Sequence, residues 1–161
     1  MDITIRKFKK TDEVAFKKTI TAIQTLDRTY KEGYIAPEKM VDDWFDLLME
    51  DKKTYDGEIY VADVDGNAVG FLSIRLEPPT EESEIFMEPD KNALITHYYV
   101  FPEFRGKGIG KRLLINMEDY AKKRHVRYVR TYVCAGNKNA REIYQRFGFI
   151  DEDIIIVKKI Q

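Results

Sequence analysis

Residues 105–111 read Arg-Gly-Lys-Gly-Ile-Gly-Lys, and the sequence around them predicts a strand before this stretch and a helix after it. The apolar run that precedes the glycines ends at Val100. Glycines let the backbone come close to an anion, and the free N–H groups of a first helical turn point toward it. Arg105, Lys107 and Lys111 add positive charge. The stretch therefore predicts a site for a phosphate or pyrophosphate group.

Two well-known phosphate loops do not fit this stretch. A dinucleotide-binding loop would need a third glycine at position 111, which is Lys. A Walker A loop would need glycine at position 105 and Ser or Thr at position 112, and both are Arg. A glycine-rich turn with solvated cations remains an alternative, because short glycine motifs recur by chance.

Working outward from the loop, the apolar spacing predicts six strands and four helices. The expected order is β-α-α-β-β-β-α-β-α-β, with antiparallel hairpins first and a crossover unit after them. This order predicts the α/β class, with a mixed sheet and helices on both faces. The expected strands are 3–8, 58–63, 68–76, 93–100, 127–133 and 153–160, and the expected helices are 11–26, 37–48, 111–124 and 139–147.

Composition narrows the class of protein. A chain of 161 residues with 43% hydrophobic residues is expected to form one domain, residues 1–161. The net charge of -1 argues against nucleic acid or an anionic membrane as the main partner. No apolar run approaches the roughly 20 residues that span a bilayer. The first residues lack the apolar stretch of a signal peptide, and the single Cys134 cannot form an internal disulfide. We therefore expect a cytoplasmic protein.

A second segment, Asn137 to Phe149, reads NKNAREIYQRFGF. Together with the glycine loop, it resembles the GCN5-related N-acetyltransferase (GNAT) family. The family pattern Arg/Gln-x-x-Gly-x-Gly/Ala is matched by the loop, and the pattern Asn-x-x-Ala-x-x-x-Tyr-x-x-x-Gly-Phe is matched by the helix that follows. The specific motifs cover about residues 94–150. The matching residues are Arg105, Gly108, Gly110, Asn137, Ala140, Tyr144, Gly148 and Phe149.

The resemblance implies acetyl-CoA as the cosubstrate. In such proteins the glycine loop binds the CoA pyrophosphate through backbone N–H groups, and the fourth strand parts from the fifth so that its backbone binds the pantetheine arm. Pro102 agrees with this picture, because it cannot continue a strand ladder. The implied cofactor-binding residues are Tyr98, Tyr99, Val100, Arg105, Gly106, Lys107, Gly108, Ile109, Gly110, Lys111, Asn137 and Tyr144.

The same resemblance implies that Tyr144 is catalytic, as the general acid that protonates the departing thiolate. A phenol titrates near 10 and a thiol near 8.5, so the tyrosine is a protonated donor at neutral pH. A structural core tyrosine is the alternative reading. Asn137 is implied as a pantetheine ligand, with a helix cap as its alternative, and Asn139 is expected to cap the helix.

The general base is not evident from the sequence. Thr96 and Leu94 stand where family members often have a base, and neither can serve. His97 has a suitable intrinsic pKa. However, side chains alternate along a strand, so His97 is expected to point to the opposite face from Thr96 and Tyr98 unless a bulge intervenes. Glu32 is another candidate, and a chain of water molecules is a third. Metal binding is not expected, because the His and Cys residues lack ligand spacing.

The acceptor is expected to be a primary amine of a small molecule or peptide. The resemblance places it beside the first two helices and the loop after the third strand, where carboxylates and aromatic rings would suit a cationic amine. A solvated acidic loop is the plainer interpretation. A regulatory module that binds acetyl-CoA without catalysis, another acyl-CoA donor and a homodimer all remain possible. The residues concerned are Asp27, Tyr30, Glu32, Tyr34, Glu77, Glu81, Glu82, Glu84 and Glu88.

Overall fold

The computed structural model describes residues 2–80, 85 and 90–160. Its five-stranded sheet has the order β1-β2-β3-β4-β5, and all neighbours are antiparallel except β4 and β5, which are parallel. The expected mixed sheet is confirmed. Its strands are β1 (Ile3–Lys7), β2 (Glu58–Val64), β3 (Asn67–Glu77), β4 (Asn92–Val100) and β5 (Tyr128–Thr131).

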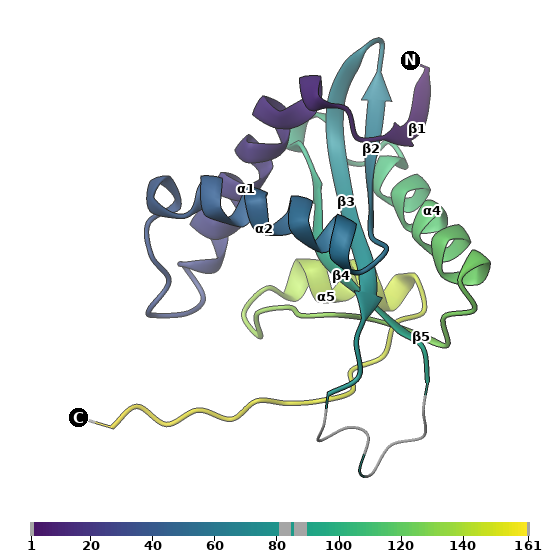
Figure 1. Cartoon of the computed structure of the whole chain (residues 1–161). Coiled ribbons are helices and arrows are strands. Elements are labelled where there is room, and N and C mark those ends of the chain that lie inside the picture. The colour runs from purple at the N-terminus through teal and green to yellow at the C-terminus, as the bar shows by residue number, and fades with distance from the viewer. Residues whose placement is uncertain (1, 81–84, 86–89, 161) are drawn as a thin grey trace.

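Helices cover both faces of the sheet, as the sequence predicts. Figure 1 shows α1 and α2 on one side of the sheet and α4 on the other. Short 3-10 turns precede α1 and α2 and follow β4. The helices are α1 (Glu13–Asp27), α2 (Val41–Thr54), α4 (Ile109–Lys123) and α5 (Lys138–Arg146), and the turns are η1 (Lys10–Asp12), η2 (Pro37–Lys39) and η3 (Pro102–Phe104). Pro37 thus opens η2, and α2 starts four residues later than expected.

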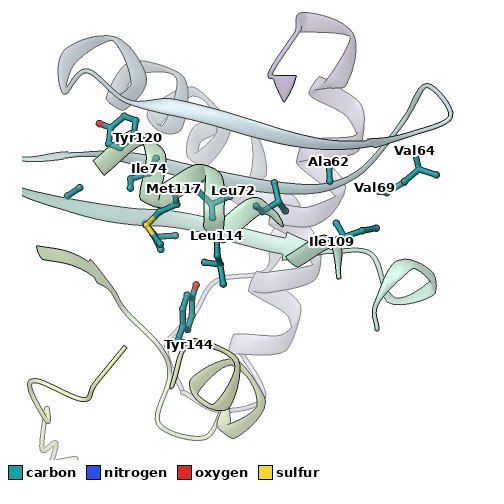
Figure 2. Close-up of a cluster of buried hydrophobic side chains, with 13 residues drawn as sticks. Ala62, Val64, Val69, Leu72, Ile74, Ile109, Leu114, Met117, Tyr120 and Tyr144 are labelled. Carbon is teal, nitrogen blue, oxygen red and sulfur yellow. The ribbon is translucent and has the colours of Figure 1, made fainter. Parts of the chain in front are cut away.

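The sheet separates two apolar cores because side chains alternate along each strand. On β3, Phe71 packs into the core under α1 and α2, where its ring stacks on Phe16 at 4.9 Å. Leu72 and Ile74 pack into the other core, under α4 and α5. Figure 2 shows this second core, with Tyr144 of α5 directed toward Leu114 of α4. The glycine loop and α5 are therefore held over the same face of the sheet.

The last expected strand is not formed. Residues 150–160 have no regular secondary structure, and Figure 1 shows this end of the chain running away from the body. The prediction of a strand at 153–160 was therefore wrong for this structure. The residues have strong strand propensity, but a strand also needs a neighbouring strand for its backbone N–H and C=O groups.

Within the described ranges, no helix is both long and apolar enough to cross a membrane.

Part of the expected acceptor region cannot be placed. The loop after the third strand includes residues 81–84 and 86–89, which lie outside the described ranges, and Glu81, Glu82, Glu84 and Glu88 are among them. Glu77 is described, as the last residue of β3, and its carboxylate lies 3.5 Å from Arg130 of β5.

Candidate functional site

Strands β4 and β5 are paired over only part of the length of β4. The register joins Asn92 to Tyr128 at one end and Ile95 to Thr131 at the other. Strand β4 then continues to Val100, while β5 ends. In the part of the chain that the structure describes, the β4 edge that faces away from β3 has no strand partner beyond Ile95. Its free backbone groups can pair with an extended ligand as with another strand.

A bulge accompanies this separation on the other edge of β4. Ser73 of β3 is paired with His97, and the next residue, Ile74, is paired with Ile95, so Thr96 is the extra residue. The Thr96 hydroxyl donates to the Ser73 hydroxyl at 3.1 Å. Bulges bend a strand and increase its twist. The bulge at Thr96 therefore coincides with the point where β4 leaves β5.

The glycine loop turns the chain from β4 into α4. Gly106 and Gly108 have φ angles of 74° and 79°, in the left-handed region that favours glycine. A Cβ atom at either position would meet nothing within 4 Å, so the backbone conformation, not crowding, requires glycine there. Nε of Arg105 donates to the Val100 carbonyl at 2.9 Å and holds the loop against the end of β4.

The start of α4 offers backbone N–H donors beside the open space at Gly106 and Gly108. Gly108 is the N-cap of α4 and has no side chain to accept from the first amides. The amides of a first helical turn have no partner within the helix, so they remain available to a ligand. Nζ of Lys107 bonds the Glu103 carbonyl at 3.0 Å, which keeps its charge at the loop. The combination of free amides, cations and open space fits a pyrophosphate group.

Tyr98 connects the three parts of the site. Its hydroxyl lies so close to Gly110 that a Cβ atom there would come within 2.3 Å of it. Its ring also lies 5.7 Å from the ring of Tyr144, measured between centroids. Burial raises the pKa of Tyr98 to about 12. The separated end of β4, the first turn of α4 and the catalytic candidate on α5 therefore meet at one side chain.

Tyr144 lies where the two parallel strands separate. Its side chain is 7% exposed and packs edge-on against Phe149 at 5.2 Å. Burial raises the pKa of Tyr144, and a hydrogen bond with Thr131 opposes that rise. Thr131 is also the last residue of β5 that is paired with β4. A protonated phenol therefore sits beside the last pair of the β4–β5 ladder.

Asn137 is the N-cap of α5, because its Oδ1 accepts from the Ala140 amide at 3.1 Å. Asn139 lies inside the helix, so the expectation that Asn139 caps it was wrong. The structure thus gives Asn137 the cap that the sequence analysis held as its alternative role.

His97 and Glu32, the two candidate bases, both have partners away from the separated strands. His97 is 4% exposed and lies edge-on to Phe16 under α1. The Thr19 hydroxyl gives its hydrogen to the Phe16 carbonyl, so the 2.8 Å contact with His97 requires an N–H on Nε2. Burial lowers the pKa of His97 to about 3. Glu32 is exposed and pairs with Lys159 at 2.8 Å.

Sequence reasoning did not associate Cys134 with the expected acceptor residues Asp27, Tyr30 and Tyr34. The Cys134 thiol lies 4.0 Å from the Tyr34 hydroxyl, and the thiol also interacts with Asp27. The neighbouring Gly136 lies against Tyr30, where a Cβ atom would come within 2.6 Å of the ring. Burial raises the pKa of Asp27, Tyr34 and Cys134. No sequence signal links these residues, because about a hundred positions separate the two loops.

Solved structures share this fold over nearly the whole chain. The structure of AAC(6')-Iy in complex with the bisubstrate analog CoA-S-monomethyl-acetylneamine superposes with a TM-score of 0.70 at 15% identity, over 100% of this chain and 99% of that one. YycN of Bacillus subtilis superposes with a TM-score of 0.73 at 22% identity, over 99% of both chains. At these identities the likeness shows the fold alone.

Sequence comparison is more specific. An uncharacterized N-acetyltransferase of Methanocaldococcus jannaschii is 34% identical over 128 residues, which cover 80% of this chain and 53% of the relative. One of Archaeoglobus fulgidus is 35% identical over 124 residues, with 73% of this chain and 79% of the relative covered. The chain spans about half the length of the M. jannaschii relative and of B. subtilis YycN, at 53% and 54%. The family model for the acetyltransferase (GNAT) family matches residues 20–149. This chain belongs to that family.

Proposed function

We propose that this chain is an N-acetyltransferase that transfers an acetyl group from acetyl-CoA to a primary amine of a small molecule or peptide. The observation that supports this most is the position of Tyr98. It joins the unpaired end of β4 to Gly110 of α4 and to Tyr144 of α5. A cosubstrate with a pyrophosphate, an extended arm and a leaving thiol would use the start of α4 for the pyrophosphate, the edge of β4 for the arm and Tyr144 for the thiol. The matching family model is described as an acetyltransferase family, and the relatives in M. jannaschii and A. fulgidus are named N-acetyltransferases.

In this proposal the donor lies along the free edge of β4. The backbone amides of Gly106 to Lys111, which include Ile109 at the start of α4, hold the pyrophosphate. Arg105 and Lys107 supply the positive charge. The backbone of Tyr98, Tyr99 and Val100 holds the pantetheine arm. An N–H group of this edge donates to the thioester oxygen as negative charge develops on it.

The chemistry is a direct transfer. The amine nitrogen attacks the thioester carbon, the C–S bond breaks, and the nitrogen loses a proton to water. The departing thiolate takes the hydroxyl proton of Tyr144, which regains one from solvent. Because burial raises the pKa of Tyr144, the phenol keeps this proton over the whole neutral range. Asn137 positions α5, and through it Tyr144, by capping the helix.

The acceptor side has carboxylates and aromatic rings. Asp27, Tyr30 and Tyr34 lie in the segment that packs on the loop after β5, and Glu77 adds a carboxylate at the end of β3. We assign the acceptor amine to this side, because carboxylates and rings attract an ammonium group. Neither His97 nor Glu32 is placed to take its proton, so water serves as the base. We also propose a cytoplasmic location, which agrees with Cys134 being a free thiol.

A second candidate function is a regulatory module that binds acetyl-CoA without transferring the acetyl group. The observation that favours it is the burial of His97, which removes the one histidine of β4 from the site. A donor with another acyl chain is a variant of the first proposal. The two functions predict different behaviour toward amines.

An acceptor screen separates the two functions. Release of free thiol from acetyl-CoA is followed over a panel of polyamines, amino sugars and peptides with a free amine, with succinyl- and propionyl-CoA in parallel. Amine-dependent thiol release with at least one acceptor is expected. Binding of acetyl-CoA without amine-dependent release across the panel would favour the regulatory module.

A further inference from the structure

Asp27, the last residue of α1, differs from the other carboxylates of the expected acceptor region. Glu32 pairs with Lys159 at 2.8 Å, and Glu77 lies 3.5 Å from Arg130. Within the described ranges, the partly buried carboxylate of Asp27 has no Lys or Arg at ion-pair distance, and its hydrogen-bond partner is a thiol. Taking a carboxylate out of water without a cation is unfavourable, and groups in this state gather at functional sites.

The loop that follows β5 orients Asp27. The Cys134 thiol donates a hydrogen bond to the Asp27 carboxylate, and the Tyr34 hydroxyl lies 4.0 Å from the Cys134 sulfur. A carboxylate has two oxygens and about four lone-pair sites. The bond from the thiol therefore leaves most of the acceptor capacity of Asp27 free for water.

The groups around Asp27 leave it as the member of the cluster that can take up a proton. Burial raises the pKa of Asp27, and the hydrogen bond from Cys134 opposes that rise only in part. Burial also raises the pKa of Cys134 and of Tyr34, so both stay protonated at neutral pH. The ammonium group of Lys31 lies over the Tyr34 ring, 5.3 Å from its centroid. A carboxylate with a raised pKa is a better base than an ordinary one.

This cluster lies close to the end of the β4–β5 ladder. Tyr144 has a hydrogen bond with Thr131, the last residue of β5 that is paired with β4. Cys134 follows Thr131 by three positions, so their Cα atoms are at most about 11 Å apart. The Asn137 amide donates to the Cys134 carbonyl at 2.7 Å, which ties the same loop to the start of α5. A short chain of water molecules spans such a distance.

We propose that Asp27 is the final acceptor of the proton that the attacking amine gives up. This inference rests on the proposed function and names the group behind the water that serves there as the base. As the neutral nitrogen bonds to the thioester carbon and the C–S bond breaks, an N–H proton passes to water, and water gives a proton to an Asp27 oxygen. The thiolate takes the proton of Tyr144. Asp27 then releases its proton to solvent, and Tyr144 regains one.

Turnover of Asp27→Asn in the full chain tests this role. With the panel amine that gives the fastest thiol release, kcat should fall about 10²-fold, the lower end of what an acid or base contributes, while the affinity for acetyl-CoA stays nearly unchanged. The matched control is Asp46→Asn, at an exposed carboxylate of α2, which should keep the wild-type rate. Circular dichroism confirms that both variants are folded. An unchanged kcat in Asp27→Asn overturns the proposal, and so does a rise in the KM of the amine alone, because Asp27 would then only bind the acceptor.

Two further readouts distinguish a proton acceptor from a group that only supports the fold. In the wild type, kcat should fall on the acid side as Asp27 becomes protonated, and Asp27→Asn should lack that fall. In Asp27→Ala, added formate should raise the rate, because it supplies a carboxylate, whereas formamide has a similar shape but is not basic and should not. Identical pH profiles in the wild type and Asp27→Asn, or equal effects of formate and formamide, overturn the proposal.

The same experiments keep this assignment separate from the proposed function. A wild type that transfers acetyl to no amine of the panel contradicts the proposed function, and the role of Asp27 falls with it. A wild type that transfers acetyl no faster than Asp27→Asn contradicts only the role of Asp27.

Discussion

At the residue scale, the Tyr144 hydroxyl is kept protonated by its surroundings. The rings of Tyr98 and Phe149 exclude water from it, and the polar neighbour is the hydroxyl of Thr131. A phenol in this setting can give up its proton only to a group that becomes strongly basic beside it. The thiolate departs into the same apolar surroundings, and desolvation raises its basicity just as it raises the pKa of the phenol, so a buried tyrosine is compatible with an acid role.

Replacing Tyr144 by Phe should lower turnover by about 10²–10⁴-fold, the usual contribution of a general acid, and leave the affinity for acetyl-CoA nearly unchanged. Because burial raises the Tyr144 pKa, the wild-type rate should show no loss from this group up to about pH 10, the ordinary pKa of a tyrosine. The matched control is Tyr120→Phe, a buried tyrosine whose hydroxyl donates to the Asp56 carbonyl at 2.7 Å. An unchanged rate in Tyr144→Phe would contradict the assignment of Tyr144 as the general acid.

His97 makes stability depend on pH. Its pKa is about 3 in the folded chain and about 6.5 when unfolded, so the fold prefers the neutral ring. The stabilisation is complete above pH 6.5 and is lost as the pH falls toward 3. The free energy of unfolding should therefore fall by up to about 1.4 kcal/mol per pH unit below 6.5. Urea denaturation at pH 7.5 and pH 5 measures this change.

The comparison for that measurement is His97→Gln, which keeps a polar side chain near Thr19 but does not titrate. The loss of stability between the two pH values should be smaller in this variant by the His97 contribution. If wild type and variant change equally, His97 is not buried as described. The pH profile of the turnover rate should also show no fall at mildly acidic pH from His97, because the pKa of His97 is far below neutral.

At the element scale, the close approach of α4 to β4 depends on Gly110. Gly110→Ala should destabilise the fold by about 1–3 kcal/mol, because its Cβ would lie 2.3 Å from the Tyr98 hydroxyl. Tyr98→Phe removes that hydroxyl and leaves the ring carbon at 3.4 Å, an ordinary contact. In the double variant, the same alanine should therefore be nearly neutral. A double-mutant cycle by urea denaturation gives the coupling, and additive effects would contradict the described packing.

The cap of α5 gives a second element-scale prediction. Asn137→Ala should lower stability by about 1 kcal/mol, because the Ala140 amide loses its acceptor. Asn137→Asp retains an acceptor oxygen and should restore most of that stability. If the amide N–H₂ group of Asn137 also binds pantetheine, then Asn137→Asp will recover stability without recovering acetyl-CoA affinity. Thermal denaturation and calorimetric titration of the two variants separate these roles.

Elements with strong local signals were the ones that the sequence predicted well. The turn of the β2–β3 hairpin reads Asp65-Gly66, and both residues have positive φ angles in the structure. The glycine motif and the apolar spacing after it were equally strong signals, and the structure has a loop and the helix α4 at these positions. The expected strand at 153–160 shows the opposite case. Its residues favour a strand, but strand formation depends on a pairing partner that local sequence does not specify.

At the scale of the whole molecule, the site depends on contacts between distant segments. The Cys134–Tyr34 contact joins positions a hundred residues apart, and the Thr96 bulge appears only when the registers of β3 and β4 are compared. Neither has a local signature. The family motifs predict a donor side because they lie on one contiguous stretch, 105–149. The proposed acceptor side is assembled from several segments, so no single residue of the sequence stood out as the base.

The central claim, that the free edge of β4 and the start of α4 bind acetyl-CoA, is tested most directly by isothermal titration calorimetry with the purified full chain. We expect one acetyl-CoA per chain. We also expect the affinity to fall about tenfold or more in Arg105→Glu/Lys107→Glu, because charge-assisted contacts contribute about 1.5–3 kcal/mol. The absence of binding heat in the wild type, or an affinity that this double variant leaves unchanged, would contradict the account.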